Sequence, residues 1–78
     1  MIRLDLATLS RAELEREVRE RCSAFGAVAS VVIVQDSKNF AFALAAVEMS
    51  DSAHRLTVLR QLGDSLVDNT VVIRIEQQ

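Results

Sequence analysis

Few side chains in this 78-residue chain are of the kinds that commonly carry catalysis or bind metal. His54 is the only histidine and Cys22 the only cysteine, and one residue of each kind at this spacing makes no zinc site. Cys22 falls on the apolar stripe of an expected helix, where a free cysteine acts as a small hydrophobic residue. His54 fits a solvated first turn of a second helix. We therefore expect no enzyme activity, no metal and no cofactor.

Glutamates in the first expected helix alternate with arginines. Glu15 and Arg19, like Glu17 and Arg21, are four residues apart in the orientation that favours helical ion pairs, each worth roughly a few tenths of a kcal/mol. This pattern predicts a solvated helix face rather than a pair of catalytic carboxylates. The link Ala7-Thr8-Leu9 between the first strand and helix contains no glycine-rich loop for phosphate.

The segment from Lys38 to Met49, KNFAFALAAVEM, alternates two sets of apolar residues. Side chains two apart on a strand share a face, so each set paves one side of the expected strand. One set is small and lets helices approach closely: Ala41, Ala43, Ala45 and Val47. The other set holds two of the three aromatic residues of the chain: Phe40, Phe42, Leu44 and Ala46. The outer face of a one-sided sheet is usually polar, so this apolar face predicts a covered binding surface.

The first half of the chain predicts a strand, a helix and a second strand. Residues 2–6, IRLDL, alternate as a strand does, with the core-facing set Ile2, Leu4 and Leu6. Ser10 and Glu13 form a capping box that opens a helix, and Gly26 ends it. The buried stripe of that helix is Leu14, Val18, Cys22 and Phe25. The β-branched run 28–34 is the second strand, and a polar turn at 35–39 makes a hairpin with the third.

The second half predicts a helix and a closing strand. Residues 50–52 supply the cap of a helix that ends at Gly63. Its expected buried stripe contains Ala53, Leu56, Leu59 or Val58, and Leu62. Leu66 and Val67 bridge to a turn at Asp68 and Asn69, after which Val71–Ile75 closes the sheet.

The element order is βαββαβ, which predicts an α+β ferredoxin-like domain. We expect a four-stranded antiparallel sheet with two helices on one face, because each crossover takes the right hand. Residues 1–78 form a single domain, and Met1 together with this fit predicts a whole protein. The other sheet face then carries no helix.

Several segments resemble the RNA recognition motif family. Residues 25–36, FGAVASVVIVQD, resemble the helix end and second strand of that family. Residues 47–51, VEMSD, resemble the end of its third strand, and Leu62-Gly63 followed by residues 71–75 resembles its last loop and strand. The similarity covers nearly the whole chain, and it implies a sheet face that binds single-stranded RNA by stacking aromatic side chains on bases.

The resemblance implies two alternative placements of the stacking site. Lys38 to Ala43 matches the longer family motif, with Phe40 and Phe42 as the stacking aromatics and Asn39 in place of glycine. Anchoring on Val47-Glu48-Met49 instead puts Leu44 and Ala46 at those positions. The two alignments differ by four residues, and an even shift leaves every side chain on its own face. The shorter family motif would place its aromatic at Arg3, whose guanidinium can also stack on a base.

Strand alternation completes the expected binding face. Ser30, Val32 and Val34 point outward on the second strand, and Val72 and Arg74 point outward on the last. The predicted nucleic-acid or partner-binding residues are Arg3, Val32, Val34, Lys38, Phe40, Phe42, Leu44 and Arg74. A contiguous apolar patch of this kind usually marks an interaction surface.

Two functions are consistent with that face. The resemblance favours an RNA-binding module that binds single-stranded RNA weakly. The aliphatic residues and the net charge of −2 favour instead a protein-interaction or homodimerisation domain that binds no RNA. The longest apolar run, residues 31–34, is too short to span a bilayer, and no signal peptide is visible. We therefore expect a cytoplasmic domain with no membrane partner.

Overall fold

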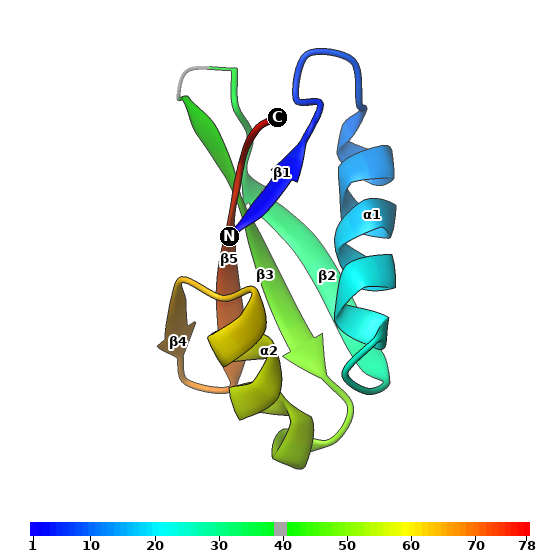
Figure 1. The fold of residues 1–78 in the computed structure, drawn as a ribbon, viewed down its shortest axis with the longest axis vertical. Helices are drawn as coiled ribbons and strands as arrows, with labels where there is room; N and C mark the ends of the chain where they lie inside the picture. The colour runs from blue at the N-terminus through cyan, green and yellow to red at the C-terminus, as the bar shows by residue number, and fades with distance from the viewer. Residues whose placement is uncertain (39–40) are drawn as a thin grey trace.

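A computed structural model of the protein describes residues 1–38 and 41–78 (Figure 1). Two helices and a sheet make up the fold, with a short 3-10 turn, η1 (Ser52–His54), ahead of the second helix. The helices are α1 (Arg11–Ser23) and α2 (Arg55–Gln61). The strands are β1 (Ile2–Leu4), β2 (Val28–Gln35), β3 (Phe42–Met49), β4 (Ser65–Val67) and β5 (Thr70–Gln77).

The α+β prediction is confirmed, but the sheet differs from the expected four-stranded antiparallel one. It has five strands in the order β1-β5-β3-β2, with β4 added beside β5. β5 pairs with β3 along one side, and on its other side β1 pairs with its end and β4 with its beginning. The pairing of β1 with β5 is parallel, so the sheet is mixed. β5 is longer than the predicted strand at residues 71–75 and lies inside the sheet. The three-residue strands β1 and β4 both pair with its outer side.

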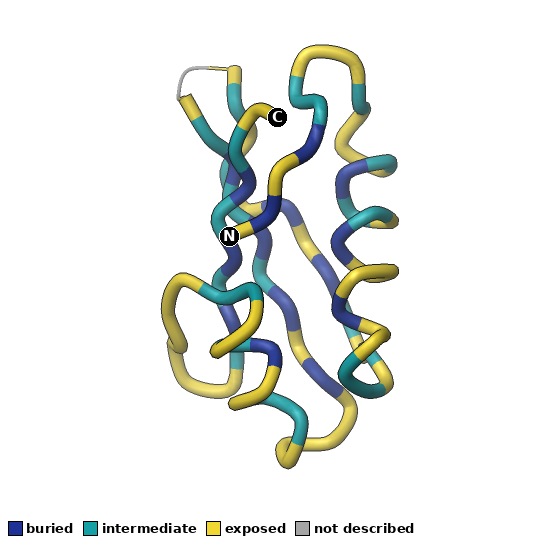
Figure 2. The backbone as a smooth tube through the Cα atoms, viewed as in Figure 1, coloured by how far each residue is buried: buried dark blue, intermediate teal, exposed yellow. Residues whose placement is uncertain are grey.

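The predicted alternation of side chains holds along β3 and β5 and over residues 30–33 of β2, which has a register irregularity on either side of that stretch. On β3, Ala43, Ala45 and Val47 are fully buried, while the residues between them are half-buried or exposed. β5 and β2 contribute further inward residues: Val71, Ile73, Ile75, Val31 and Ile33. Figure 2 shows this alternation of buried and exposed positions along the strands. These residues form one core together with side chains from both helices, so both helices lie on the same face of the sheet.

The first helix begins and ends as predicted. The Ser10 hydroxyl accepts a hydrogen bond from the Glu13 N–H, and the Glu13 carboxylate accepts one from the Ser10 N–H, which completes the capping box. The carboxylate is stabilised by these bonds, which lower the pKa of Glu13. Leu14, Val18 and Cys22 form the buried stripe, whereas Phe25, its fourth predicted member, lies beyond the end of α1 at Ser23 and packs partly buried against the core.

Gly26 follows α1 with a φ of 149°, a value that few other residues adopt. The ring of His54 packs directly against it, and a Cβ at Gly26 would lie 2.3 Å from His54 Nδ1. The glycine therefore serves two purposes: it redirects the chain and leaves room for the histidine.

The predicted stripe of the second helix is partly wrong. Val58 is buried, and Leu59 and Leu62 pack against the core, but Ala53 and Leu56 are exposed. The reason is that the chain after Asp51, whose side chain caps the turn, starts as 3-10 helix rather than α-helix. The tighter winding shifts which residues face the sheet.

Side chains of α1 cover the free edge of β2. The N–H of Ile33 donates to Glu15 Oε2 at 2.9 Å, and its carbonyl accepts a hydrogen bond from Arg11 Nη2. One turn further along the helix, Arg19 Nη1 donates to the carbonyl of Val28 at 3.1 Å. The sequence predicted the acidic and basic residues of this helix as a solvated face with Glu15 paired to Arg19, whereas Glu15 and Arg19 both bind strand backbone. The edge is thus blocked against pairing with another strand.

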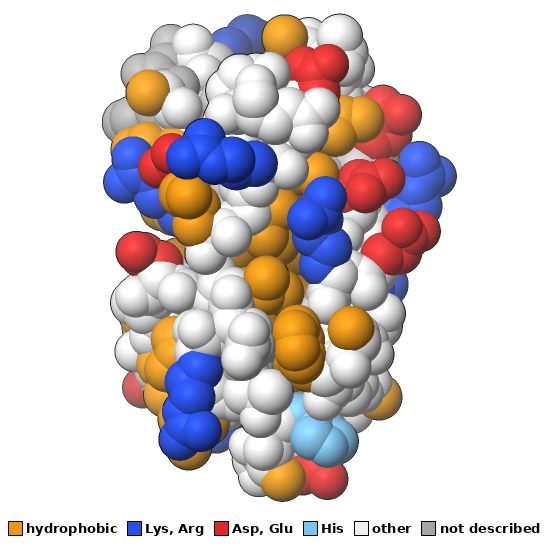
Figure 3. All heavy atoms as spheres, in the orientation of Figure 1, with side chains coloured by type: hydrophobic (Ala, Val, Ile, Leu, Met, Phe, Trp, Pro, Cys, Tyr) orange, Lys and Arg blue, Asp and Glu red, His pale blue; other side chains and the backbone are white. Residues whose placement is uncertain are grey.

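Apolar side chains also show in a seam between the two helices when the molecule is viewed from the helix side (Figure 3). None of the helices in the described part of the chain is long and apolar enough to cross a membrane.

We predict that Glu15→Ala lowers the free energy of unfolding by about 1 to 2 kcal/mol, because it leaves the N–H of Ile33 without its charged acceptor. Urea unfolding followed by circular dichroism measures this change. Glu20→Ala is the matched control: it removes the same charge from an exposed position of the same helix and should have little effect. Equal effects of the two changes would contradict the role of Glu15.

The buried thiol of Cys22 should be unreactive in the folded protein. Cys22 is fully buried, and burial raises its pKa to about 11, so almost none of the reactive thiolate forms near neutral pH. We expect dithionitrobenzoate to modify Cys22 only as fast as the domain unfolds, with a rate that rises as urea is added. Rapid modification in native buffer, with an unchanged circular dichroism spectrum, would show that the thiol is accessible.

Candidate functional site: the open face of the sheet

The outward side of the sheet is the best candidate for a functional surface. We call it the open face, because both helices lie on the opposite side. It consists of the outward residues of the three long strands: Ser30, Val32, Val34, Gln35, Phe42, Leu44, Ala46, Glu48, Thr70, Val72, Arg74 and Glu76. Strand register fixes which of them are neighbours.

An apolar row crosses the middle of the open face. Val32 of β2 pairs with Ala46 of β3, which pairs with Val72 of β5. Val32 retains 47% of its surface exposed, and Val34 beside it retains 58%. Val34 lies at a register irregularity between Ile33 and Gln35, so the register gives it no partner on β3. The large apolar side chains of Val32 and Val34 thus face solvent, Val32 within the apolar row and Val34 beside it.

One end of the open face holds a compact group of three side chains. The Arg74 guanidinium lies 3.9 Å from the centre of the Phe42 ring, a cation–π contact. The Nε of Arg74 also forms an ion pair with Glu76 Oε2 at 2.6 Å. One side of the ring is therefore occupied by the chain itself.

Arg3 lies at the same level along the strands as Glu76 and Phe42, but it is on β1, which is not adjacent to β3. It pairs with Glu76 of β5, which in turn pairs with Phe42 of β3, so β5 stands between Arg3 and Phe42. Its Nη1 contacts the carbonyl of Gln77 at 3.4 Å. The first of the two alignments placed the phenylalanines beside Arg3, whereas in the structure Arg3 lies on an outer strand and β5 separates it from Phe42. Phe40, the other predicted aromatic, lies outside the described residues.

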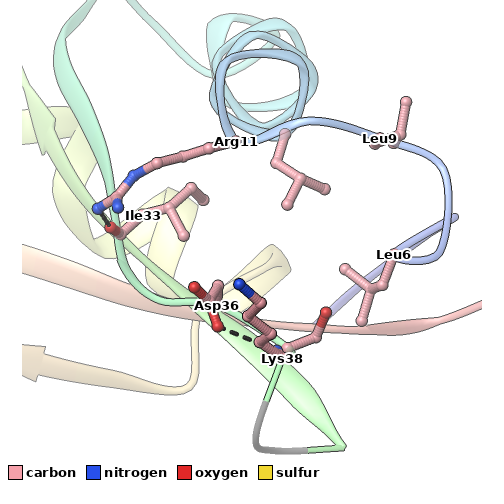
Figure 4. Close-up of a pocket in the computed structure, with 8 residues that line it drawn as sticks. Leu6, Leu9, Arg11, Ile33, Asp36 and Lys38 are labelled. Carbon is pink, nitrogen blue, oxygen red and sulfur yellow. Dashed lines mark hydrogen bonds between the residues drawn. The ribbon is translucent and has the colours of Figure 1, made fainter.

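Lys38 lies in the connection between β2 and β3, since β3 begins only at Phe42. It lines a pocket of about 410 Å³ between the start of α1, the end of β2 and the link from β1 to α1 (Figure 4). The apolar residues that line this pocket are Leu6, Leu9, Leu14 and Ile33. The polar ones are Arg11, Asp36, Ser37 and Lys38. Figure 4 shows Arg11 turned toward the carbonyl of Ile33, and the N–H of Lys38 donating to Asp36. Lys38 is thus separate from the other predicted residues.

The strand β4 was not predicted from the sequence, and neither was the position of Val67 at its end. Leu66 and Val67 were expected to be a bridge, but they pair with Val71 and Thr70 in a hairpin around Asp68. Asp68 has a φ of 54°, the left-handed conformation that aspartate tolerates in tight turns. The two residues Asp-Asn between two apolar runs were the signal that could have predicted this hairpin.

The open face has a charge polarity along its strands. Arg74 lies two residues from Val72 toward the C-terminal end of β5, and Arg3 flanks the same end. Glu48 lies two residues from Ala46 toward the other end, next to Ser30. Glu76 offsets part of the positive charge through its pair with Arg74. Arg74 and Glu48 therefore lie on opposite sides of the apolar row.

The described residues contain no group of three or more His, Cys, Asp or Glu side chains that could hold a metal ion. His54 packs on Gly26, and Cys22 is buried in the core. Comparisons with models of protein families, with curated proteins and with solved structures find no match to this chain. The open face alone is thus the basis for a functional proposal.

The exposed valines of the open face should contribute little to folding. We predict that Val32→Thr changes the free energy of unfolding by less than about 0.5 kcal/mol, because Val32 is half exposed. Val31→Thr is the matched control on the same strand: Val31 is 8% exposed, and burying its new hydroxyl should cost about 1 to 3 kcal/mol. Urea unfolding measures both. A Val32→Thr loss as large as that of Val31→Thr would mean that Val32 serves the fold instead of binding.

Proposed function

We propose that this protein is a self-association module, in which the open face binds the open face of a second copy. The observation that supports this most directly is the apolar row Val32–Ala46–Val72 with Val34 at its side. Aliphatic side chains on a flat sheet suit the packing of another sheet, since facing sheets interdigitate such residues. They give nothing to base stacking.

Protected sheet edges favour association through the face. At one edge, Arg11, Glu15 and Arg19 occupy backbone groups of β2 that another strand would otherwise bind. At the other edge stand only the short strands β1 and β4. Short or covered edges resist strand addition. The open face is the large apolar surface that remains.

The energetics are sufficient for a reversible dimer. Removing apolar surface from water stabilises by roughly 25 cal/mol per Å², so covering a few hundred Å² contributes several kcal/mol. Association costs of similar size oppose this gain. We therefore expect a dimer that dissociates on dilution rather than an obligate one.

Binding of single-stranded RNA is the second candidate, and the Phe42–Arg74 group favours it. An aromatic ring with a guanidinium at 3.9 Å resembles half of a stacking site, and Arg3 lies in the same row. Against it, Arg74 already covers one side of the ring, and Glu76 and Glu48 repel phosphate.

Together with this second candidate function, we propose a relationship to the RNA recognition motif family and its ferredoxin-like sheet. The first part of the chain, β1-α1-β2-β3-α2, follows the βαββα portion of the expected order and supports it. The fold departs from it in having a fifth strand, β5, which lies between β1 and β3 and pairs with β1 in parallel.

We predict a concentration-dependent dimer by sedimentation velocity, and its loss in Val32→Asp, because a carboxylate buried in an apolar interface is costly. Leu56→Asp is the matched control, since Leu56 is 53% exposed on the helix side, and this variant should dimerise as wild type. Titration with a single-stranded RNA pool at low salt runs in parallel. A monomer at all concentrations that binds RNA, and loses it in Phe42→Ala, would replace the proposal with RNA binding.

A further inference from the structure

We infer that the two copies form a closed twofold pair, in which Arg74 of each copy meets Glu48 of the other. This inference rests on the proposed function and adds the arrangement and the residues that select it. The twofold axis lies between the two facing sheets and crosses the strands along the row Val32–Ala46–Val72.

The strand register makes this axis self-complementary. An axis across the strands superposes the apolar row on its own copy, valine against valine and alanine against alanine. This axis also reverses the strand direction of the second copy. The end of the open face that carries Arg74 in one copy therefore faces the end that carries Glu48 in the other. Arg74 and Glu48 are each two residues from the row, on opposite sides of it and on neighbouring strands. The reversal therefore brings each arginine near the partner's glutamate.

The competing twofold axis, parallel to the strands, is disfavoured by charge. It would keep the strand directions aligned and set Arg74 at the level of the second Arg74, and Glu48 at the level of the second Glu48. Like charges facing each other in a partly desolvated interface are costly, and opposite charges select a register. Charge thus chooses between two arrangements that the apolar row alone would permit.

Both charged side chains are available for this contact. The side chain of Arg74 is 41% exposed, and its pair with Glu76 uses Nε, which leaves further donors on the terminal nitrogens. Glu48 is exposed, and within residues 1–38 and 41–78 no hydrogen bond or ion pair is formed by its carboxylate. A partner copy would supply its counter-charge.

Twofold closure limits the assembly to two copies. Each open face is fully used by its partner, because the contact is isologous. The edges that could extend the assembly are capped by α1 or end in short strands. The expected particle is a dimer with helices on its two outer sides.

A charge-exchange experiment tests the arrangement. Glu48→Arg and Arg74→Glu should each weaken self-association by about tenfold or more at low salt, since each places like charges across the interface. An equimolar mixture of the two variants should associate to within about threefold of wild type, because every mixed pair restores both contacts. Sedimentation velocity, with one variant carrying a fluorophore, measures the mixed dimer, and about 1 M salt should reduce these differences.

Controls separate folding from binding. Glu20→Arg makes the same charge change as Glu48→Arg on the exposed side of α1 and should associate as wild type. Because Arg74→Glu also loses the contact with Phe42, Arg74→Gln serves as a second variant: it should associate weakly alone, and its mixture with Glu48→Arg should regain only one of the two contacts and so associate more weakly than the mixture of Glu48→Arg with Arg74→Glu. Circular dichroism melts show which variants are folded.

The outcomes distinguish the two proposals. If Val32→Asp dissociates the dimer but the mixture of charge variants is no stronger than either alone, the twofold arrangement is overturned and self-association stands. If wild type does not self-associate at all, the proposed function fails with it. A mixed dimer that exceeds both parent dimers supports both.

Discussion

Strict alternation of side chains along β3 and β5, combined with helices on only one side, is the constraint on which the structure depends. Ala43, Ala45 and Val47 bury the inward face completely, and their small volume lets the helices approach. The same backbone presents Leu44, Ala46 and Val72 on the other side, where no described helix covers them. Because a one-residue shift would exchange the two faces, the core and the open face are fixed together.

The helix α1 has two roles at once. Its apolar stripe fills the core with Leu14, Val18 and Cys22, while Glu15 and Arg11 reach the backbone of Ile33 at the sheet edge. Edge protection of this kind limits strand-to-strand association, which is a common route to uncontrolled assembly. It leaves the open face as the surface through which a specific and self-limiting contact can form.

Local signals in the sequence predicted the parts of this fold that depend on neighbouring residues. The capping box at Ser10, the glycine at the end of α1 and the faces of the long strands follow from short-range rules, and the structure confirms them. The order of the strands is decided by long-range pairing, so the central place of β5 and the edge position of Arg3 could not be predicted in this way.

The limits at the candidate site have similar causes. Lys38 was assigned to the binding face because it matches the basic start of the longer family motif, but β3 begins four residues later and Lys38 lines a pocket. The pairing of Arg74 with Phe42 and Glu76 required knowledge of which strands are adjacent. Exposure of Val32 and Val34, in contrast, followed from parity alone and is the part of the site that sequence predicted best.

The most direct test of self-association through the open face is an isotope-filtered nuclear Overhauser experiment on a mixture of labelled and unlabelled protein. It detects only contacts between different copies. Our account predicts contacts among the methyl groups of Val32, Ala46 and Val72 at concentrations where the dimer forms. Intermolecular contacts that involve only helix-side residues such as Leu56, or none at all at millimolar concentration, would contradict it.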